Sequence, residues 1–138
     1  MCVPSDSASL QESAGSGAEW TVLVVDDDPD MTAVADAYLE RLDGVSVRTS
    51  SDPDAALARL SEVDCVVSDY EMPGMDGFAL LDAVRSSRPA LPFVVFTGSL
   101  DERVAERARD RGARYVEKGP MGGGFDRLAS EIERLRED

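Results

Sequence analysis

The sequence is short of the side chains that build several common kinds of site. Its 138 residues include no histidine, two cysteines, one tryptophan and a single lysine, Lys118. Without histidine, and with only two scattered cysteines, a tetrahedral zinc site is excluded. Cys2 lies in a predicted tail and Cys65 in an apolar run, which argues against a disulfide framework. No apolar run approaches the ~20 residues of a membrane-spanning helix. The N-terminus also lacks the basic start of a secretory signal, so we expect a cytoplasmic protein with no membrane contact.

Positive charge is scarce as well. The chain has 28 acidic and 14 basic residues, a net charge of −14. This balance argues against nucleic-acid binding, because phosphates need a basic surface. An acidic chain that uses arginine in place of lysine is typical of adaptation to high internal salt, where carboxylates keep the surface solvated. The one lysine that the composition retains therefore needs an explanation of its own.

The length suits one domain. Residues 1–19 are rich in serine, alanine and glycine and show no periodicity, so we predict a disordered leader there and a folded domain over 20–138. From Trp20 onward, short apolar runs alternate with segments of helical periodicity. Strands are expected at 20–25, 45–49, 63–68, 92–96 and 113–116, and helices are expected near 29–42, 53–60, 76–84, 100–111 and 125–135. Five βα repeats predict an α/β fold, a doubly wound five-stranded parallel sheet with helices on both faces.

Polar side chains stand at the ends of four of these strands. Ligands of such sheets bind beyond the carboxyl ends of the strands, so these side chains are expected to converge. The residues at these strand ends are Asp26, Asp27 and Asp28 after the first strand, Asp69 after the third, Thr97 (followed by Gly98, which has no side chain) after the fourth, and Lys118 after the fifth. An acidic run is more often a solvated loop, but its place directly after a buried strand favours a site. Asp28 is better explained as a helix cap than as a ligand, because Pro29 follows it.

The chemistry of this group favours a cation and a phosphoryl group. Two carboxylates about 4 Å apart repel by about 4 kcal/mol at an effective dielectric constant of about 20, so a cluster shares a proton or binds a cation. Carboxylate oxygens suit Mg²⁺ or Mn²⁺. A divalent ion, the Thr97 hydroxyl and the Lys118 ammonium around one carboxylate would stabilise the charge of a phosphoryl group. The carboxylate that accepts that group would be the nucleophile.

Four segments of the chain resemble the receiver domain of two-component response regulators. They are Val24–Pro29, Ser68–Gly77, Phe96–Gly98 and Tyr115–Lys118, and the segment with Asp69 followed by Met-Pro-Gly-Met-Asp-Gly is the most specific. The resemblance runs from about Thr21 to the C-terminus. It implies a flavodoxin-like sheet with strand order 2-1-3-4-5.

The resemblance also implies roles for individual residues. Asp69 would be the phosphoacceptor for a phosphohistidine on a sensor histidine kinase, with Mg²⁺ bound by Asp27, Asp69 and the backbone carbonyl of Glu71. Asp26 would act on the ion mostly through water.

The remaining implied roles concern the response to phosphorylation. Thr97 would bind a phosphoryl oxygen, Lys118 would pair with the phosphoryl group, and Tyr115 would be the aromatic switch that turns inward. Helix four, strand five and helix five would bind an unknown output protein or a second copy. We expect a stand-alone receiver that catalyses only its own phosphorylation and dephosphorylation.

The segment after Lys118 departs from the family pattern. The family lysine is usually followed directly by a proline in a cis bond, whereas Gly119 here comes before Pro120. The three glycines at 122–124 predict a loose connection to the last helix, because glycine restricts the backbone least.

Two other interpretations remain open from the sequence. The run ending in Asp26-Asp27-Asp28 also fits a haloacid-dehalogenase-like phosphatase, with Asp26 as nucleophile and Asp28 as acid and base. Pro29 does not fit that pattern, and Asp69 with its turn is left unexplained. The third interpretation is a receiver-like interaction module that is not phosphorylated.

Overall fold

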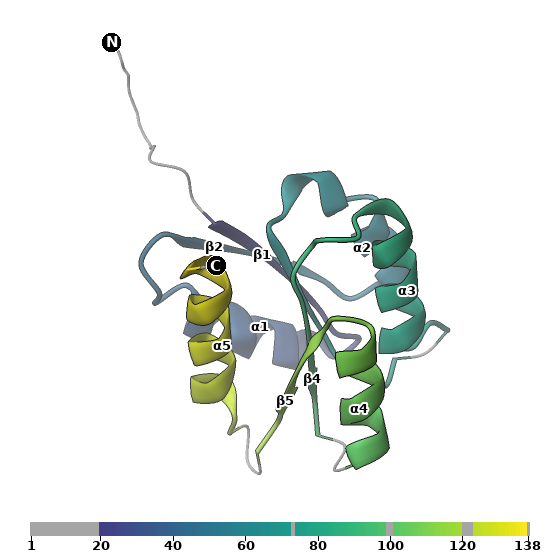
Figure 1. Ribbon diagram of the computed structural model, residues 1–138. Helices are drawn as coiled ribbons and strands as arrows, with labels where there is room; N and C mark the ends of the chain where they lie inside the picture. The colour runs from purple at the N-terminus through teal and green to yellow at the C-terminus, as the bar shows by residue number, and fades with distance from the viewer. Residues whose placement is uncertain (1–19, 73, 99–100, 120–122, 138) are drawn as a thin grey trace.

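The computed structural model describes residues 20–72, 74–98, 101–119 and 123–137, so the predicted leader and Pro120 lie outside the described residues. Five parallel strands form one sheet in the order β2-β1-β3-β4-β5, which confirms the predicted fold class and strand order (Figure 1). The strands are β1 (Trp20–Val25), β2 (Val45–Ser50), β3 (Cys65–Ser68), β4 (Phe93–Thr97) and β5 (Arg114–Glu117). The helices are α1 (Pro29–Leu39), α2 (Pro53–Leu57), α3 (Gly77–Ser87), α4 (Glu102–Asp110) and α5 (Phe125–Glu137), with a short 3₁₀ helix, η1 (Leu60–Glu62), after α2.

The helices cover both faces of the sheet. One core cluster joins the sheet to α2, α3 and α4, and a second joins it to α1 and α5, as the two sides of Figure 1 show. Strands β3 and β4 are buried along their whole length, and β1 over its last four residues. This burial explains why their sequences are continuously apolar, while the half-exposed edge strand β2 alternates. In the described part of the chain, no helix combines the length and the apolar character needed to cross a membrane.

Aspartates begin four of the helices. Each is the N-cap, and its carboxylate accepts a hydrogen bond from a backbone N–H of the first turn, a contact typically worth about 1 kcal/mol. The pairs are Asp28 with Asp30, Asp52 with Asp54, Asp76 with Ala79 and Asp101 with Arg103, at 2.8–3.0 Å. Asp28 is therefore a cap, as predicted.

Two helices end earlier than the periodicity predicts. Helix α1 ends at Leu39, and the chain then turns through Gly44, which has a φ of +77°. Helix α2 ends at Leu57, so Leu60 lies in η1 instead of on the same helix. The guanidinium of Arg88 donates to the carbonyls of Leu60 and Val63 at 2.5 and 2.7 Å, so backbone oxygens at the start of η1 and directly after it are paired by a distant side chain.

A second arginine joins α3 to the turn between α4 and β5. The Arg85 guanidinium donates to the carbonyls of Leu91, Arg111 and Gly112 at 2.7, 3.0 and 3.2 Å. Burial lowers the pKa of Arg85 from its ordinary value. Arg111 adds an ion pair with Asp82 of α3 at 2.9 Å, so the last turn of α4 is fastened to α3.

Candidate functional site

Three aspartates meet where β1 and β3 end. The strands pair in parallel with Val25 opposite Ser68, so the residues that follow them emerge side by side. The Asp69 N–H donates to the Val25 carbonyl at 3.1 Å. Asp26, Asp27 and Asp69 each place one carboxylate oxygen within 4.8 Å of the other two. The predicted convergence of Asp26, Asp27 and Asp69 is therefore confirmed.

The three carboxylates differ in their surroundings. Asp26 is 3% exposed, whereas Asp27 is exposed and Asp69 is half-buried. Burial raises the pKa of the Asp26 carboxyl above its ordinary value. The Asp28 N–H, which donates to Asp26 Oδ1 at 3.0 Å, and the Lys118 ammonium act in the opposite direction. The balance leaves Asp26 more costly to ionise than a carboxyl in water.

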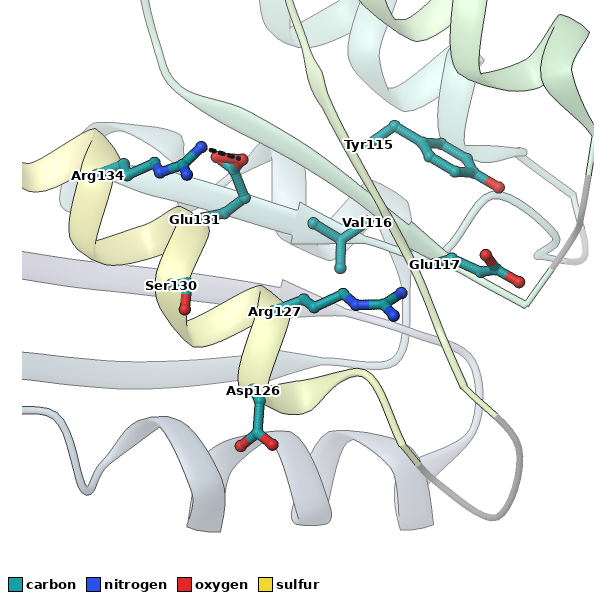
Figure 2. A pocket seen from close by; sticks show the side chains of 8 residues that line it. All are labelled: Tyr115, Val116, Glu117, Asp126, Arg127, Ser130, Glu131 and Arg134. Atoms are coloured by element: carbon teal, nitrogen blue, oxygen red, sulfur yellow. Dashed lines mark ion pairs between the residues drawn. The ribbon is translucent and has the colours of Figure 1, made fainter.

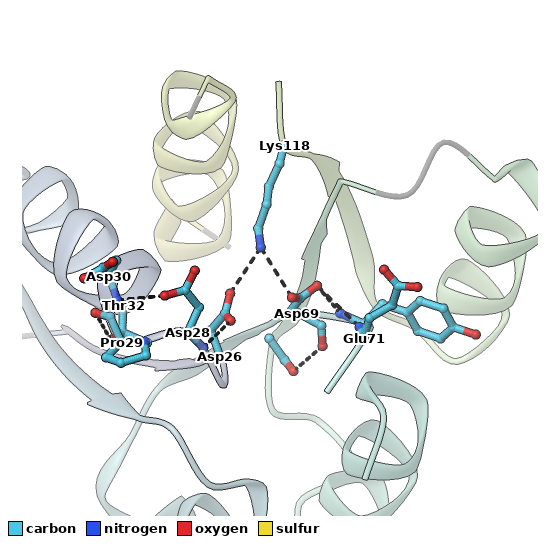
Figure 3. A network of polar contacts seen from close by, with 10 residues as sticks. Asp26, Asp28, Pro29, Asp30, Thr32, Asp69, Glu71 and Lys118 are labelled. Atoms are coloured by element: carbon cyan, nitrogen blue, oxygen red, sulfur yellow. Dashed lines mark hydrogen bonds and ion pairs between the residues drawn. The ribbon is translucent and has the colours of Figure 1, made fainter. Parts of the chain in front are cut away.

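The single lysine lies at the centre of this group. Lys118 Nζ is 3.1 Å from Asp26 Oδ2 and 3.5 Å from Asp69 Oδ2, as Figure 3 shows, and its side chain is 15% exposed. The ammonium also lies 5.6 Å from the centre of the Phe96 ring. Phe96 belongs to one of the four family-like segments, but its contact with Lys118 was not predicted, because only the packed structure brings the ring under the ammonium.

The donor set fits a divalent cation. One ammonium cannot balance three carboxylates, so the cluster keeps an excess of negative charge. Oxygen ligands from carboxylates are those that Mg²⁺ prefers, and no nitrogen or sulfur ligand contributes to the described cluster. Asp26, Asp27 and Asp69 are thus the residues that could hold the ion.

The loop after β3 fixes the orientation of Asp69. Its Oδ1 accepts the N–H groups of Tyr70 at 2.7 Å and Glu71 at 3.4 Å, while Oδ2 faces Lys118. Gly77 supports this loop from α3: its N–H donates to the Tyr70 carbonyl at 2.7 Å, and a Cβ there would lie 2.5 Å from the Asp69 carbonyl oxygen. Sequence analysis did not give Gly77 this packing role, although a glycine directly after a helix cap was a signal. Pro73, in the same loop, lies outside the described residues.

Thr97 and Tyr115 lie near the same edge but in different settings. Thr97 is buried at the end of β4, and its carbonyl accepts the Lys118 N–H at 2.9 Å. Tyr115 is half-buried against the core cluster shared with α3 and α4. Burial raises the pKa of Tyr115, and the nearby carboxylates of Glu117, Glu102 and Asp101 add to this effect. Tyr115 therefore contacts the core on the α4 side of the sheet.

A groove runs between β5 and α5. Its volume is about 470 Å³, and Figure 2 shows the side chains around it. Both acidic and basic side chains line it, and Glu131 pairs with Arg134 at 3.6 Å. The lining residues are Tyr115, Val116, Glu117, Asp126, Arg127, Ser130, Glu131 and Arg134. Tyr115 and Glu117 line this groove and belong to β5, the strand that ends directly before Lys118.

A parallel sheet of order 2-1-3-4-5 with an acidic cluster and a lysine at its carboxyl edge defines a receiver-type signalling domain. The sequence profile of the response regulator receiver domain matches residues 22–121, so the chain belongs to that family. The chemotaxis response regulator CheY4 of Vibrio cholerae superimposes with a TM-score of 0.75 at 28% sequence identity, covering 86% of this chain and 99% of that one.

The curated relatives are longer regulators. Nitrogen assimilation regulatory protein NtrX of Azorhizobium caulinodans is 35% identical over 121 residues, and the match covers 84% of this chain and 26% of NtrX. The bacterioopsin transcriptional activator of Halobacterium salinarum is 36% identical over 125 residues, with 89% and 18% covered. The chain thus spans about a quarter or less of these proteins. Receiver domains are in general signalling domains that bind Mg²⁺ at an acidic pocket and interact with histidine kinases.

Replacing Asp27 by Ala is expected to weaken Mg²⁺ binding at least about tenfold, since loss of even an outer partner of a metal ligand costs about that much. Asp28→Ala is the matched control: it removes a neighbouring carboxylate that caps α1 and lies outside the three-carboxylate cluster. Calorimetric titration with MgCl₂ measures both. Equal losses in the two variants would show that general negative charge, and not the cluster, binds the ion.

Proposed function

We propose that Asp69 accepts a phosphoryl group from a phosphohistidine on a sensor histidine kinase, in the presence of Mg²⁺ or Mn²⁺. The observation that carries this proposal is the position of the Lys118 ammonium, 3.1 Å from Asp26 and 3.5 Å from Asp69 in a cluster of three carboxylates. An ammonium at that point neutralises the carboxylate that must approach an anionic group. It also remains beside that group after transfer.

The transfer is a displacement at phosphorus. A carboxylate oxygen of Asp69 forms the new P–O bond, the P–N bond to the histidine ring breaks, and its electron pair stays on the ring nitrogen. The backbone N–H groups of Tyr70 and Glu71 hold the Asp69 carboxylate in one orientation. Lys118 pairs with the phosphoryl oxygens, and the Thr97 hydroxyl donates to one of them.

The three-aspartate cluster is also the proposed site of the Mg²⁺ ion. Asp27, Asp69 and the backbone carbonyl of Glu71 would hold Mg²⁺ directly, and Asp26 would act through water. When bound, the ion offsets the charge of the incoming phosphoryl oxygens. The burial of Asp26 supports its indirect role, because its carboxylate already pairs with Lys118 and with the Asp28 N–H.

The response is proposed to pass from Thr97 to Tyr115 and then to the surface formed by α4, β5 and α5. The Lys118 N–H bond to the Thr97 carbonyl joins the residue directly after β5 to the end of β4, and Tyr115 lies on β5, three residues before Lys118. A cytoplasmic output protein or a second copy of the chain would bind the changed surface. We expect no direct contact with nucleic acid, given the net charge of −14.

Mapping of the acyl phosphate tests this function. The protein is incubated with acetyl phosphate and MgCl₂, and borohydride reduction converts the phosphorylated aspartate to homoserine, which mass spectrometry locates. We expect the label at Asp69. A label at Asp26 would support the phosphatase alternative, whose nucleophile is that residue, and no label at all would support an interaction module that is not phosphorylated.

Beryllofluoride tests the proposed switch. Its addition with Mg²⁺ is expected to shift the ring resonances of Tyr115 in an NMR spectrum, because the phosphoryl mimic draws Lys118 and Thr97 toward Asp69. Lys118→Ala is expected to remove that shift. An unchanged response in Lys118→Ala would show that the site and Tyr115 are not coupled through β5.

A further inference from the structure

The segment after Lys118 is closed by glycines and packs on the backbone of Lys118. The Gly119 N–H donates to the Gly123 carbonyl at 2.9 Å, and the Leu128 N–H donates to the Gly124 carbonyl at 3.0 Å in the first turn of α5. Gly124 has a φ of +95°, a left-handed conformation that glycine adopts readily. The sequence predicted a loose connection here. The described residues on either side of 120–122 instead form a tight contact, because the absence of side chains lets two backbone segments meet.

Gly124 has no room for a side chain. A Cβ at this position would lie 2.6 Å from the Glu117 carbonyl oxygen, 3.0 Å from the Gly119 nitrogen and 3.1 Å from Lys118 Cα. All three are backbone atoms, so no rotamer change relieves the clash. A methyl group at Gly124 must therefore move the backbone of Glu117 and Lys118 or push α5 away from it.

We infer that Gly124 is a positioning residue for Lys118. The inference rests on the proposed function, in which the Lys118 ammonium pairs with the phosphoryl group. Lys118 is held on one side by its N–H bond to the Thr97 carbonyl at 2.9 Å and on the other by the contact with Gly124. This grip fixes the point from which the side chain reaches between Asp26 and Asp69. Since the side chain is 15% exposed and covers Phe96, it has little space in which to compensate for a displaced backbone.

Gly124→Ala tests the inference through the rate of Asp69 phosphorylation by acetyl phosphate. We expect a fall of about tenfold or more, because a displacement of about 1 Å can cost up to about a hundredfold in rate. Gly112→Ala is the matched control. Gly112 also has a positive φ, +74°, but its nearest contact is the end of the Arg85 side chain at 3.8 Å, and it lies before β5 instead of after it. The control is expected to keep the wild-type rate.

A double-mutant cycle separates positioning from general structure. If Gly124 acts through Lys118, Gly124→Ala has no further effect on the rate in a Lys118→Ala background. An equal loss in both backgrounds, or a wild-type rate in Gly124→Ala, would overturn the inference. Mg²⁺ affinity should not fall, because the carboxylates follow β1 and β3 and a displaced ammonium no longer competes with the cation. Should Gly124→Ala not fold, Gly119→Ala, whose Cβ would meet Gly123 at 3.3 Å, gives a smaller displacement for the same cycle.

A second readout does not depend on phosphorylation. Lys118 is the only lysine, so trinitrobenzenesulfonate labelling, with the N-terminal amine subtracted, reports on this one ammonium. Gly124→Ala is expected to raise its reactivity several-fold as Nζ leaves the pair of carboxylates, and Gly112→Ala is expected to leave it unchanged. Unchanged reactivity in Gly124→Ala counts against the positioning role. A wild-type protein that takes no phosphate counts against the proposed function alone.

Discussion

Asp69→Asn is expected to abolish the incorporation of phosphate from radiolabelled acetyl phosphate. The amide keeps the shape of the side chain and can still accept the N–H groups of Tyr70 and Glu71, but it lacks the nucleophilic carboxylate that forms the acyl phosphate. The fold should remain intact, because the change removes one of three mutually repelling charges. The protein is precipitated with cold acid on a filter, and the radioactivity retained on the filter measures the phosphate that is bound to it.

The control for this experiment is Asp28→Asn. Asparagine caps helices as well as aspartate does, so α1 keeps its first turn while one nearby charge is removed. Labelling of this variant is expected to match the wild type. If Asp69→Asn keeps some labelling, and that labelling is lost when Asp26→Asn is added to the same protein, the nucleophile is Asp26 instead.

Lys118→Ala is expected to lower the free energy of unfolding by about 3 kcal/mol at neutral pH in the absence of divalent ions, the range found when one partner of a buried ion pair is removed. Asp26, whose side chain is 4% exposed, would be left beside Asp69 with no counter-charge at 3.1 Å. Urea unfolding measures the difference. MgCl₂ should restore much of the loss, because the cation replaces the missing positive charge.

The pH dependence of this loss has a definite sign. The pKa of Asp26 is raised in the folded state, so the folded protein binds more protons than the unfolded one between the ordinary value of 3.8 and the raised value. The contribution of Asp26 to stability therefore falls as the pH rises through that window. Without Lys118 the window extends to higher pH, and the deficit of Lys118→Ala should shrink as the solution is acidified.

Arg48→Ala is the matched control for the removal of a cation. Arg48 pairs with Glu62 at 3.3 Å, but both side chains are about half exposed, and such surface pairs contribute about 1 kcal/mol or less. A loss in Lys118→Ala no larger than that in Arg48→Ala, or one that grows at acidic pH, would contradict the electrostatic account of the site.

Much of the fold could be predicted because local signals and burial agree. The apolar runs of β3 and β4 and the last four residues of β1 are buried, and the Asp-Pro pairs at 28–29 and 52–53 begin helices as expected. The acidic cluster followed from topology alone, since parallel strands bring Asp26 and Asp69 to one edge. The lysine could be singled out because no other exists.

The remaining features depend on contacts between distant parts of the chain. The 3₁₀ helix after α2 is an example, because its first carbonyl, at Leu60, accepts a hydrogen bond from Arg88, 28 residues further along the chain. The glycines after Lys118 are a second example, because by themselves they predict a loose connection to the last helix. Only the approach of Gly124 to the Glu117 carbonyl shows that they allow close packing. The packing role of Gly77 likewise becomes visible only when α3 lies against the Asp69 loop.

The contacts of Arg85 hold the C-terminal end of α4 against α3. The carbonyls of Arg111 and Gly112, directly after α4, accept hydrogen bonds from the Arg85 guanidinium, and Arg111 pairs with Asp82. A helix that is fixed at one end is freer to rotate about that end than to shift along its axis. The opposite end of α4 begins at Glu102, whose carboxylate lies near Tyr115. If α4 rotates about its last turn, the displacement would be largest at Glu102, beside Tyr115, the residue proposed to act as the switch.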